Sequence, residues 1–189
     1  MTTTSPKDIA QIGGGTWTID PNHSLIEFAA RHFDIADVKG RFRTFSGRVE
    51  VDQQDPLASR VELTIDATSV DSGAVQGRED LIKGEEMLEV QKYPSITFRS
   101  TRIEPSGDGR FLVSGDLTMH GATRQVKIPI EFGGFAQTRM GPRAGFSGAL
   151  TLSRRDFGIA FDREFEPGRL VVSDEIKVEL QIEVAPASQ

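Results

Sequence analysis

Apolar and polar side chains alternate along much of this chain. In the segments 61–66, 126–132 and 176–184, apolar residues occupy every second position, and the positions between them are mainly polar or charged. Because successive side chains of a β-strand point to opposite faces, this period of two predicts strands with one buried and one solvated face. The pattern predicts an all-β fold.

Nine segments are predicted as strands: 17–20, 25–31, 40–51, 59–67, 95–104, 110–119, 124–132, 144–153 and 174–184. Short connections rich in Gly, Pro and Asp separate several of them, which predicts antiparallel neighbours joined as a meander. Such strands bury their apolar faces in a sandwich or in a closed barrel. A barrel of about eight strands is either filled by side chains or holds one small ligand.

Segment 40–51 changes phase along its length. Phe42 and Phe45 are three positions apart, whereas Phe45 and Val49 share parity. A slip of one residue moves a side chain to the opposite face, so a bulge or bend is expected near Thr44. Glycines inside other strands, such as Gly115 and Gly148, either permit close backbone approach or are neutral small residues.

The alternation is lost between residues 75 and 92. Leu81 and Leu88 lie seven positions apart and would share one face of a helix. Gly77 and Gly84 each disfavour a helix by roughly 1 kcal/mol relative to Ala. We expect one or two short helices in this long inter-strand connection, either covering one mouth of the barrel or packed on its outside.

Length and the two ends predict the domain organisation. A chain of 189 residues fits one domain, placed at 16–185, with a flexible leader at 1–15 and a tail at 186–189. The leader contains no apolar stretch of the kind that a signal peptide needs, so the cytoplasm is the expected location.

Charge and hydropathy narrow the classes of partner. The net charge of −6 and the pI near 5.1 argue against nucleic-acid binding, which requires clustered Lys and Arg. No stretch reaches the roughly 18 apolar residues of a membrane span, so stable membrane insertion is not expected.

Candidate catalytic chemistry is sparse. The chain has no cysteine, which excludes thiol catalysis, disulfides and Cys-based metal sites, and it has no nucleophile elbow or phosphate-binding glycine loop. His23, His32 and His120 are of a residue type that binds metals, but their spacing does not bring them together. In its tight turn, His120 is expected to form a local hydrogen bond.

Two charge clusters and the aromatic residues bear on a binding site. Arg78 precedes Glu79 and Asp80, and Arg154 and Arg155 precede an acid as well; such groups are solvated surface charges or, at the mouth of a cavity, grip a phosphate or carboxylate. The chain has 12 Phe against one Trp and one Tyr, so most aromatic rings lack a polar group and pack a core or contact an apolar ligand.

Several segments, in order along the chain, resemble motifs of the YceI family of lipocalin-like polyisoprenoid-binding proteins. They are WTIDPNHS at 17–24 with Phe28, His32 and GRF at 40–42 after it, a helix that begins at Arg78, KYPSITF at 92–98, GDLTMHGAT at 115–123, and RRDFG at 154–158. One departure is clear, because Leu81 stands where the family helix usually has a histidine.

The resemblance implies an extended antiparallel, lipocalin-like β-barrel of about eight strands. Its interior would sequester or transport a long apolar ligand, namely a polyisoprenoid, an isoprenoid quinone or a fatty-acyl lipid, without catalysis or another cofactor. Relatives often dimerise, so a homodimer is a further implied partner. The residues expected to line the barrel are His23, Phe28, His32, Phe42, Phe45, Leu63, Ile65, Leu81, Met87, Phe98, Phe132, Phe146 and Phe157, with Arg78, Arg154 and Arg155 as contacts for a head group.

Two alternatives stay open at this point. One is an enzyme that uses a histidine as a base or as a metal ligand. The other is a protein-interaction module whose barrel has a solid core.

Overall fold

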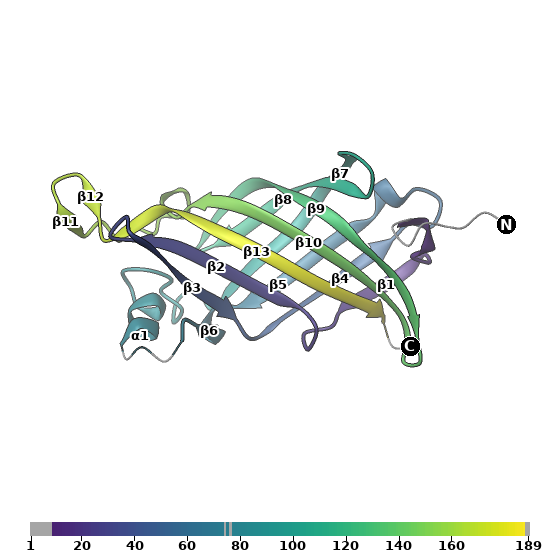
Figure 1. Ribbon diagram of the computed structural model, residues 1–189, viewed down its shortest axis with the longest axis horizontal. Coiled ribbons are helices and arrows are strands. Elements are labelled where there is room, and N and C mark those ends of the chain that lie inside the picture. Colours follow the sequence, from purple (N-terminus) through teal and green to yellow (C-terminus); the bar gives the residue numbers. More distant parts are fainter. Residues whose placement is uncertain (1–8, 74, 76, 188–189) are drawn as a thin grey trace.

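Eight strands close into a ring in the computed structural model, which describes residues 9–73, 75 and 77–187. The ring order, with β1 pairing back to β13, is β1 (Gly15–Ile19), β4 (Phe45–Val51), β5 (Arg60–Asp66), β7 (Ser95–Pro105), β8 (Arg110–Met119), β9 (Ala122–Thr138), β10 (Gly141–Ser153) and β13 (Val172–Pro186). Every pairing is antiparallel, and Figure 1 shows the strands running obliquely along an elongated barrel. The predicted all-β barrel is confirmed.

Three further strands extend the barrel beyond the ring. β2 (Leu25–His32) pairs with β13, β3 (Ala36–Phe42) pairs with β2, and β6 (Val70–Asp71) pairs with β3. The two ends of β13 therefore have different neighbours, since Val184 pairs with β1 whereas Val178 pairs with β2. Because β1 and β2 cover different parts of β13, the barrel is longer than either of these two strands.

The segment predicted as one bent strand at 40–51 is two strands. β3 ends at Phe42 and β4 begins at Phe45. Between them, the backbone N–H of Arg43 donates to the Ser69 carbonyl (3.2 Å), and that of Thr44 donates to Ser69 Oγ (3.0 Å). These bonds to a distant turn take the place of strand pairing, so the phase change marks a break at the predicted position.

Gly115 and Gly148 allow close approach inside the barrel wall. A Cβ at Gly115 would lie 2.5 Å from the Phe98 ring, and one at Gly148 would lie 2.6 Å from Ile130 Cδ1. Both distances are shorter than real Cβ contacts allow. Of the two alternatives for these glycines, close approach is therefore confirmed.

The connection at 75–92 contains a shorter helix than its apolar spacing suggests. Helix α1 covers Arg78–Lys83, and the chain then folds back, with the N–H of Leu88 donating to the Ile82 carbonyl (3.0 Å). The remaining helical elements are the 3-10 turns η1 (Ile9–Gln11), η2 (Pro56–Ala58), η3 (Ala67–Ser69) and η4 (Arg155–Phe157). A small hairpin of β11 (Glu164–Glu166) and β12 (Arg169–Leu170) was not predicted.

The described part of the predicted leader packs against one end of the barrel. Ile12, just after η1, is only 6% exposed, and the Trp17 indole N–H donates to the Gly13 carbonyl (2.9 Å). Residues 9–14, expected to belong to a flexible leader, thus contact the barrel, because Ile12 has an apolar surface to bury against. Residues 1–8 and 188–189 lie outside the described residues, while Pro186 of the predicted tail belongs to β13.

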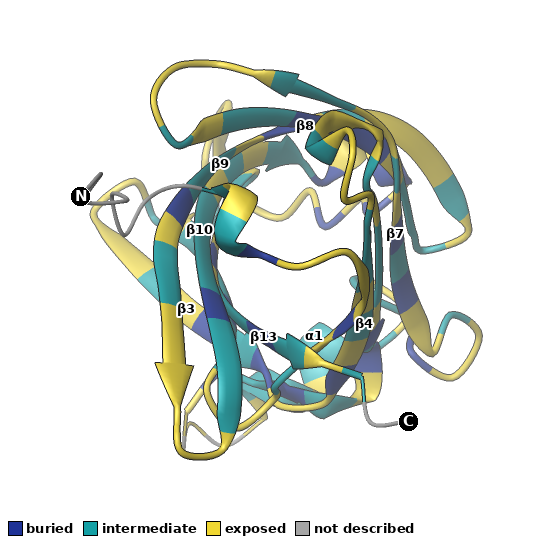
Figure 2. Ribbon diagram, turned by 90° about the vertical axis from the view of Figure 1, so that its right-hand side faces the viewer, coloured by how far each residue is buried: buried dark blue, intermediate teal, exposed yellow. Residues whose placement is uncertain are grey.

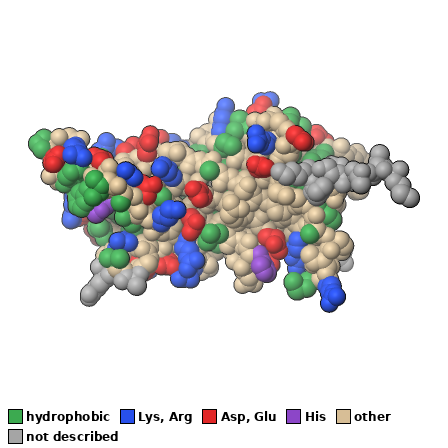
Figure 3. All heavy atoms as spheres, viewed as in Figure 1, with side chains coloured by type: hydrophobic (Ala, Val, Ile, Leu, Met, Phe, Trp, Pro, Cys, Tyr) green, Lys and Arg blue, Asp and Glu red, His purple; other side chains and the backbone are tan. Residues whose placement is uncertain are grey.

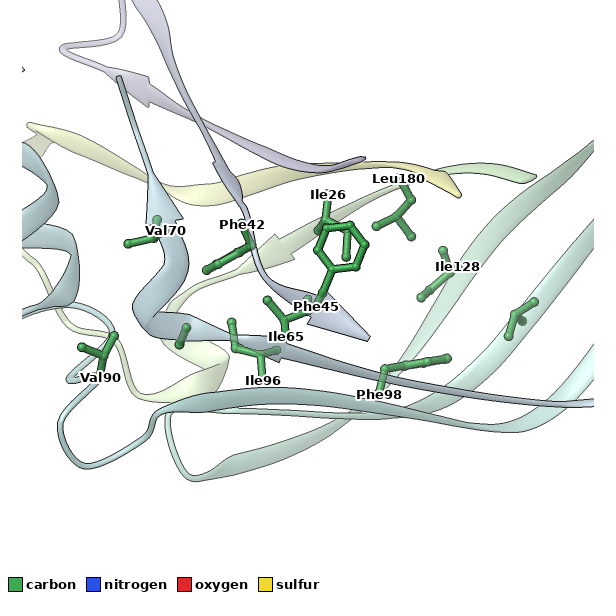
Figure 4. Close-up of a cluster of buried hydrophobic side chains, with 12 residues drawn as sticks. Ile26, Phe42, Phe45, Ile65, Val70, Val90, Ile96, Phe98, Ile128 and Leu180 are labelled. Atoms are coloured by element: carbon green, nitrogen blue, oxygen red, sulfur yellow. The ribbon is translucent and has the colours of Figure 1, made fainter. Parts of the chain in front are cut away.

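Buried side chains form two clusters inside the barrel. The larger includes Ile26, Phe45, Ile65 and Phe98 (Figure 4), and the smaller surrounds Trp17 at the end where the N-terminal segment lies. Figure 2 looks along the barrel from that end. Charges of both signs are scattered over the outer face seen in Figure 3, as expected for the solvated positions of the alternating pattern. No helix of the described residues is long and apolar enough to span a membrane.

Candidate functional site: an apolar cavity

The barrel encloses a cavity of about 660 Å³. Its wall is formed by inward-facing side chains, and β13 shows how the sequence builds it. Ile176, Val178, Leu180, Ile182 and Val184 all line the cavity, whereas the charged residues between them are absent from its wall. The alternation that predicts the strand therefore also makes the cavity apolar. The alternative of a solid-core module is wrong, because the barrel is hollow.

The two ends of the cavity differ in the elements that border it. Ile9 and Ile12 from the N-terminal segment, with Pro56 of η2, contribute to the wall at one end. At the other end the wall includes Leu81 of α1 and Phe161 from the loop after η4. We call these the η1 end and the α1 end. Of the two placements considered for the helix, covering a mouth of the barrel is the one observed.

Most of the residues expected to line the barrel do so. Eleven of the sixteen candidates are on the cavity wall: Phe28, His32, Phe42, Leu63, Ile65, Arg78, Leu81, Met87, Phe98, Phe146 and Arg154. Leu81, where the family helix usually has a histidine, thus adds apolar surface to the wall.

Three of the expected phenylalanines are packed away from the cavity. Phe45 belongs to the larger buried cluster, Phe132 is fully buried in the smaller cluster against Phe146 (ring centroids 5.4 Å apart), and Phe157 is buried in η4. None of them is on the cavity wall. The expectation that they line it is wrong, because neighbouring side chains cover their rings.

Two polar candidates lie on the outside of the barrel. His23 is 56% exposed, and Arg155 pairs with Asp162, whose Oδ1 lies 2.7 Å from its Nη2. Neither is on the cavity wall. His23 follows the end of β1, where the chain turns outward, and the carboxylate partner of Arg155 is at the surface. Their expected contacts with a ligand or head group are therefore not supported.

Arg154 faces the cavity but is engaged by the backbone. Its guanidinium is 4% exposed and donates to the carbonyls of Ile159 (2.7 Å), Phe161 (2.8 Å) and Ser173 (3.1 Å), and more weakly to that of Val172 (3.4 Å). Most of its N–H donors are thus occupied. Arg154 positions the loop at 155–163, a role that was missed because carbonyl partners leave no signature in a sequence.

Arg78, at the start of α1, has more free donors than Arg154. Its Nη1 donates to the Ser72 carbonyl (3.0 Å), and among the described residues no carboxylate lies within ion-pair distance of it. His32, at the end of β2, also lines the cavity, and its register partner Val172 accepts from Arg154. The ionisable nitrogens of the wall thus lie at the α1 end.

His120 joins two loops at the same end. Its Nδ1 donates to the Phe157 carbonyl (3.0 Å), and its Nε2 lies 3.4 Å from Glu89 Oε2, without the angle of a hydrogen bond. The Tyr93 ring packs edge-on at 4.8 Å between centroids. The expectation of a local bond is wrong, because the carbonyl partner is 37 residues away.

The three histidines do not converge on one site in the described part of the chain. Instead, His23 meets Asp20 (2.9 Å) and Glu183 (3.9 Å) on the outer surface, and Arg143 Nε lies 3.4 Å from the same Glu183 oxygen. The hydrogen bond with Asp20 raises the pKa of His23 and lowers the pKa of Asp20. This cluster is a surface ion-pair network, and one ligand atom from each of Asp20, His23 and Glu183 lies within 4.8 Å of the others, an arrangement that could also hold a metal ion.

The sequence of this chain is similar to those of a known protein family. The YceI-like domain model matches residues 17–184. A UPF0312 protein of Vibrio vulnificus (strain YJ016) is 39% identical over 138 residues, which is 72% of this chain and 72% of that protein. A UPF0312 protein of Shewanella oneidensis is 38% identical over 141 residues, covering 74% of this chain and 73% of the relative.

Solved structures share the barrel. BcnA of Burkholderia cenocepacia has a TM-score of 0.77 at 23% identity and covers 88% of this chain and 99% of its own. The YCEI protein of Campylobacter jejuni has a TM-score of 0.72 at 26% identity, covering 84% and 90%. A polyisoprenoid binding domain from Saccharophagus degradans has a TM-score of 0.69 at 17% identity, covering 90% and 98%. From its sequence match, this chain belongs to the YceI family.

Proposed function

We propose that this protein binds one long apolar molecule inside its barrel, for sequestration or transport rather than catalysis. The observation that carries the proposal is the cavity of about 660 Å³ with an almost wholly apolar wall. A cavity of that size falls in the range of small-molecule sites. The structural neighbour described as a polyisoprenoid binding domain adds support, and the candidate ligands are a polyisoprenoid, an isoprenoid quinone or a fatty-acyl lipid.

The wall chemistry favours a chain over a compact polar ligand. Apolar cavities do not hold water well, because a buried water needs several polar partners. Transfer of a ligand methylene into such a site contributes about 0.8 kcal/mol. Inward-facing Phe98, Leu117 and Val178 come from three different strands, so a bound chain would be surrounded by apolar groups. A ligand without polar groups along its length loses no hydrogen bonds on entry.

Cavity volume sets the expected ligand size. The cavity of about 660 Å³ can bury only a chain of limited length. The proposal therefore predicts that affinity rises about threefold to fourfold with each added methylene. It should stop rising once the chain fills the cavity.

Two measurements test this function. Organic extraction and native mass spectrometry of the purified protein should reveal a co-purified lipid or, after delipidation, binding of one added chain. A titration with straight-chain and prenyl alcohols of increasing length should show the rise and plateau. A folded, delipidated protein that binds none of these alcohols and gains no thermal stability from them would refute the proposal.

A further inference from the structure

We propose that Asp20, His23 and Glu183 form a binding site for one divalent transition-metal ion, such as Zn²⁺, on the outer face of the barrel. One ligand atom of each residue lies within 4.8 Å of the others, and no second group of three such residues meets this closely in the described part of the chain. None of the three side chains is on the cavity wall. The inference therefore does not depend on the proposed function.

The distances between the three side chains suit the ligands of one ion. His23 Nδ1 lies 2.9 Å from Asp20 Oδ2 and 3.9 Å from Glu183 Oε1. Ligand atoms about 2.1 Å from a tetrahedral zinc ion lie about 3.4 Å from one another, which is between these two distances. Because the His23 side chain is 56% exposed, it has room for the small adjustment that brings all three ligand atoms onto one ion.

The backbone holds the turn that carries Asp20 and His23 against Glu183. The Asp20 N–H donates to the Glu183 carbonyl (2.8 Å), and the Glu183 N–H donates to Ser24 Oγ (2.9 Å). Within the turn, the Asn22 N–H donates to Asp20 Oδ1 (2.9 Å), and the other carboxylate oxygen, Oδ2, faces His23. The fold thus positions all three residues, so an ion loses little of its binding free energy in ordering them.

The charges of the cluster favour a divalent cation. The carboxylates of Asp20 and Glu183, with oxygens within 4.8 Å of each other, repel, and a cation between them offsets that repulsion. Arg143 Nε lies 3.4 Å from Glu183 Oε1 and supplies one positive charge from the side. A metal ion bound to His23 Nδ1 would take the place of the proton shared with Asp20 Oδ2 and would bring two charges to the two acids.

The donor atoms determine the class of ion. One imidazole nitrogen and two carboxylate oxygens suit a first-row transition-metal ion such as Zn²⁺, whereas Mg²⁺ and Ca²⁺ prefer sites made of oxygen ligands alone. A surface pocket lined by Asp20, Pro142 and Arg143 adjoins the cluster. Water can therefore reach the ion and complete its coordination, as in zinc sites that have three protein ligands.

The test measures Zn²⁺ binding by calorimetry, with protein that carries no polyhistidine tag and has been treated with a chelator. The wild type is compared with Asp20→Asn, His23→Ala and Arg143→Gln, and Mg²⁺ is titrated as the second ion. Glu179→Gln is the matched control, because it removes one negative charge from the exposed face of β13, about 13 Å along the strand from Glu183. Circular dichroism verifies that each variant is folded.

The wild type should bind one Zn²⁺ per chain and should bind Mg²⁺ at least about tenfold more weakly. Asp20→Asn and His23→Ala should each weaken Zn²⁺ binding about tenfold or more, because a ligand atom is lost, whereas Glu179→Gln should change it by less than about twofold. Arg143→Gln should tighten Zn²⁺ binding roughly threefold to tenfold, since a positive charge beside the ion is removed.

Nitrogen NMR of the imidazole rings identifies the histidine that binds the ion. Zn²⁺ should shift the resonances of His23 and leave those of His32 and His120 unchanged. The inference is overturned if the wild type binds no Zn²⁺, if His23→Ala binds it as tightly as the wild type, or if the shifts occur at another histidine. Equal affinity for Mg²⁺ overturns the assignment to a transition-metal ion. Each of these results leaves the proposed function of the apolar cavity standing.

Discussion

The imidazole of His120 lies 3.0 Å, measured from Nδ1, from the carbonyl oxygen of Phe157, 37 residues further along the chain. Its other nitrogen faces Glu89 at 3.4 Å. His120 sits in the tight β8–β9 turn, whereas Glu89 lies in the connection after α1 and Phe157 ends η4. Leu88 and Ile159, which are close to them in sequence, are on the cavity wall. One side chain thereby connects three segments that are distant in sequence.

Replacing His120 by Asn should destabilise the protein by about 1–3 kcal/mol, since a buried tertiary hydrogen bond is lost and its carbonyl partner is left unpaired. Asn tolerates the left-handed backbone that His120 adopts (φ 51°), so the effect reports the side chain. Urea denaturation measures the free energy of unfolding of each variant. In His120→Asn, amide hydrogen exchange should also accelerate in residues 154–163. The exposed His23→Asn is the control; equal losses in both variants would contradict the role assigned to His120.

Arg154→Met and Arg155→Met should differ sharply although the residues are adjacent. The first leaves the carbonyls of Ile159 and Phe161 without a donor, and we expect a loss of about 2–5 kcal/mol in unfolding free energy. The second removes an exposed ion pair with Asp162 and should change stability much less. Guanidinium unfolding compares the two variants; similar midpoints would show that the carbonyl contacts contribute little.

Gly115→Ala should lower the free energy of unfolding by about 1–3 kcal/mol, because the new methyl group would lie 2.5 Å from both the Arg99 carbonyl and the Phe98 ring. Phe98 lines the cavity, so its displacement should also weaken ligand binding. Gly145→Ala is the matched control, since a Cβ there meets nothing within 4 Å. Thermal melts and chain-alcohol titrations should separate the two variants, and indistinguishable results would count against close packing at Gly115.

The pair Asp20–His23 should make stability depend on pH in two windows. Because the pKa of His23 is raised above 6.5, its contribution is complete below that value and is lost as pH rises through the folded-state pKa. Because the pKa of Asp20 is lowered from 3.8, its contribution is present above that value and is lost as pH falls through the folded-state pKa. An NMR titration should place the His23 midpoint above 6.5 and move it down in Asp20→Asn. A midpoint for His23 at or below pH 6.5 in the wild type would contradict this prediction.

The strands and the closed barrel were predictable because a half-buried strand leaves a direct signature of alternating side chains. Segment 176–184 shows this, since each apolar residue from Ile176 to Val184 faces inward. Where backbone partners come from distant parts of the chain, the signature fails. The break after Phe42 depends on Ser69, and α1 ends at Lys83 because the following chain folds back on it.

The site was predictable by residue type but not by position. Phe98 and Phe132 are equally apolar, yet Phe98 faces the cavity whereas Phe132 is covered by its neighbours. The alternation of apolar and polar residues shows which face of a strand points into the barrel. It does not show whether other side chains fill the interior next to that face or leave a cavity there. Likewise, Arg154 and Arg155 are chemically identical, and only the fold decides that one faces the cavity and the other a surface carboxylate.

The most direct test of a ligand-binding cavity is to fill it without disturbing the rest of the barrel. Val178→Trp places a large ring in the cavity, while Glu179→Trp adds the same ring to the exposed outer face of the same strand. Native mass spectrometry with geranylgeraniol then counts bound molecules in each folded variant. We predict one molecule on the wild type and on Glu179→Trp and none on Val178→Trp, whereas equal binding by all three would contradict a ligand site inside the barrel.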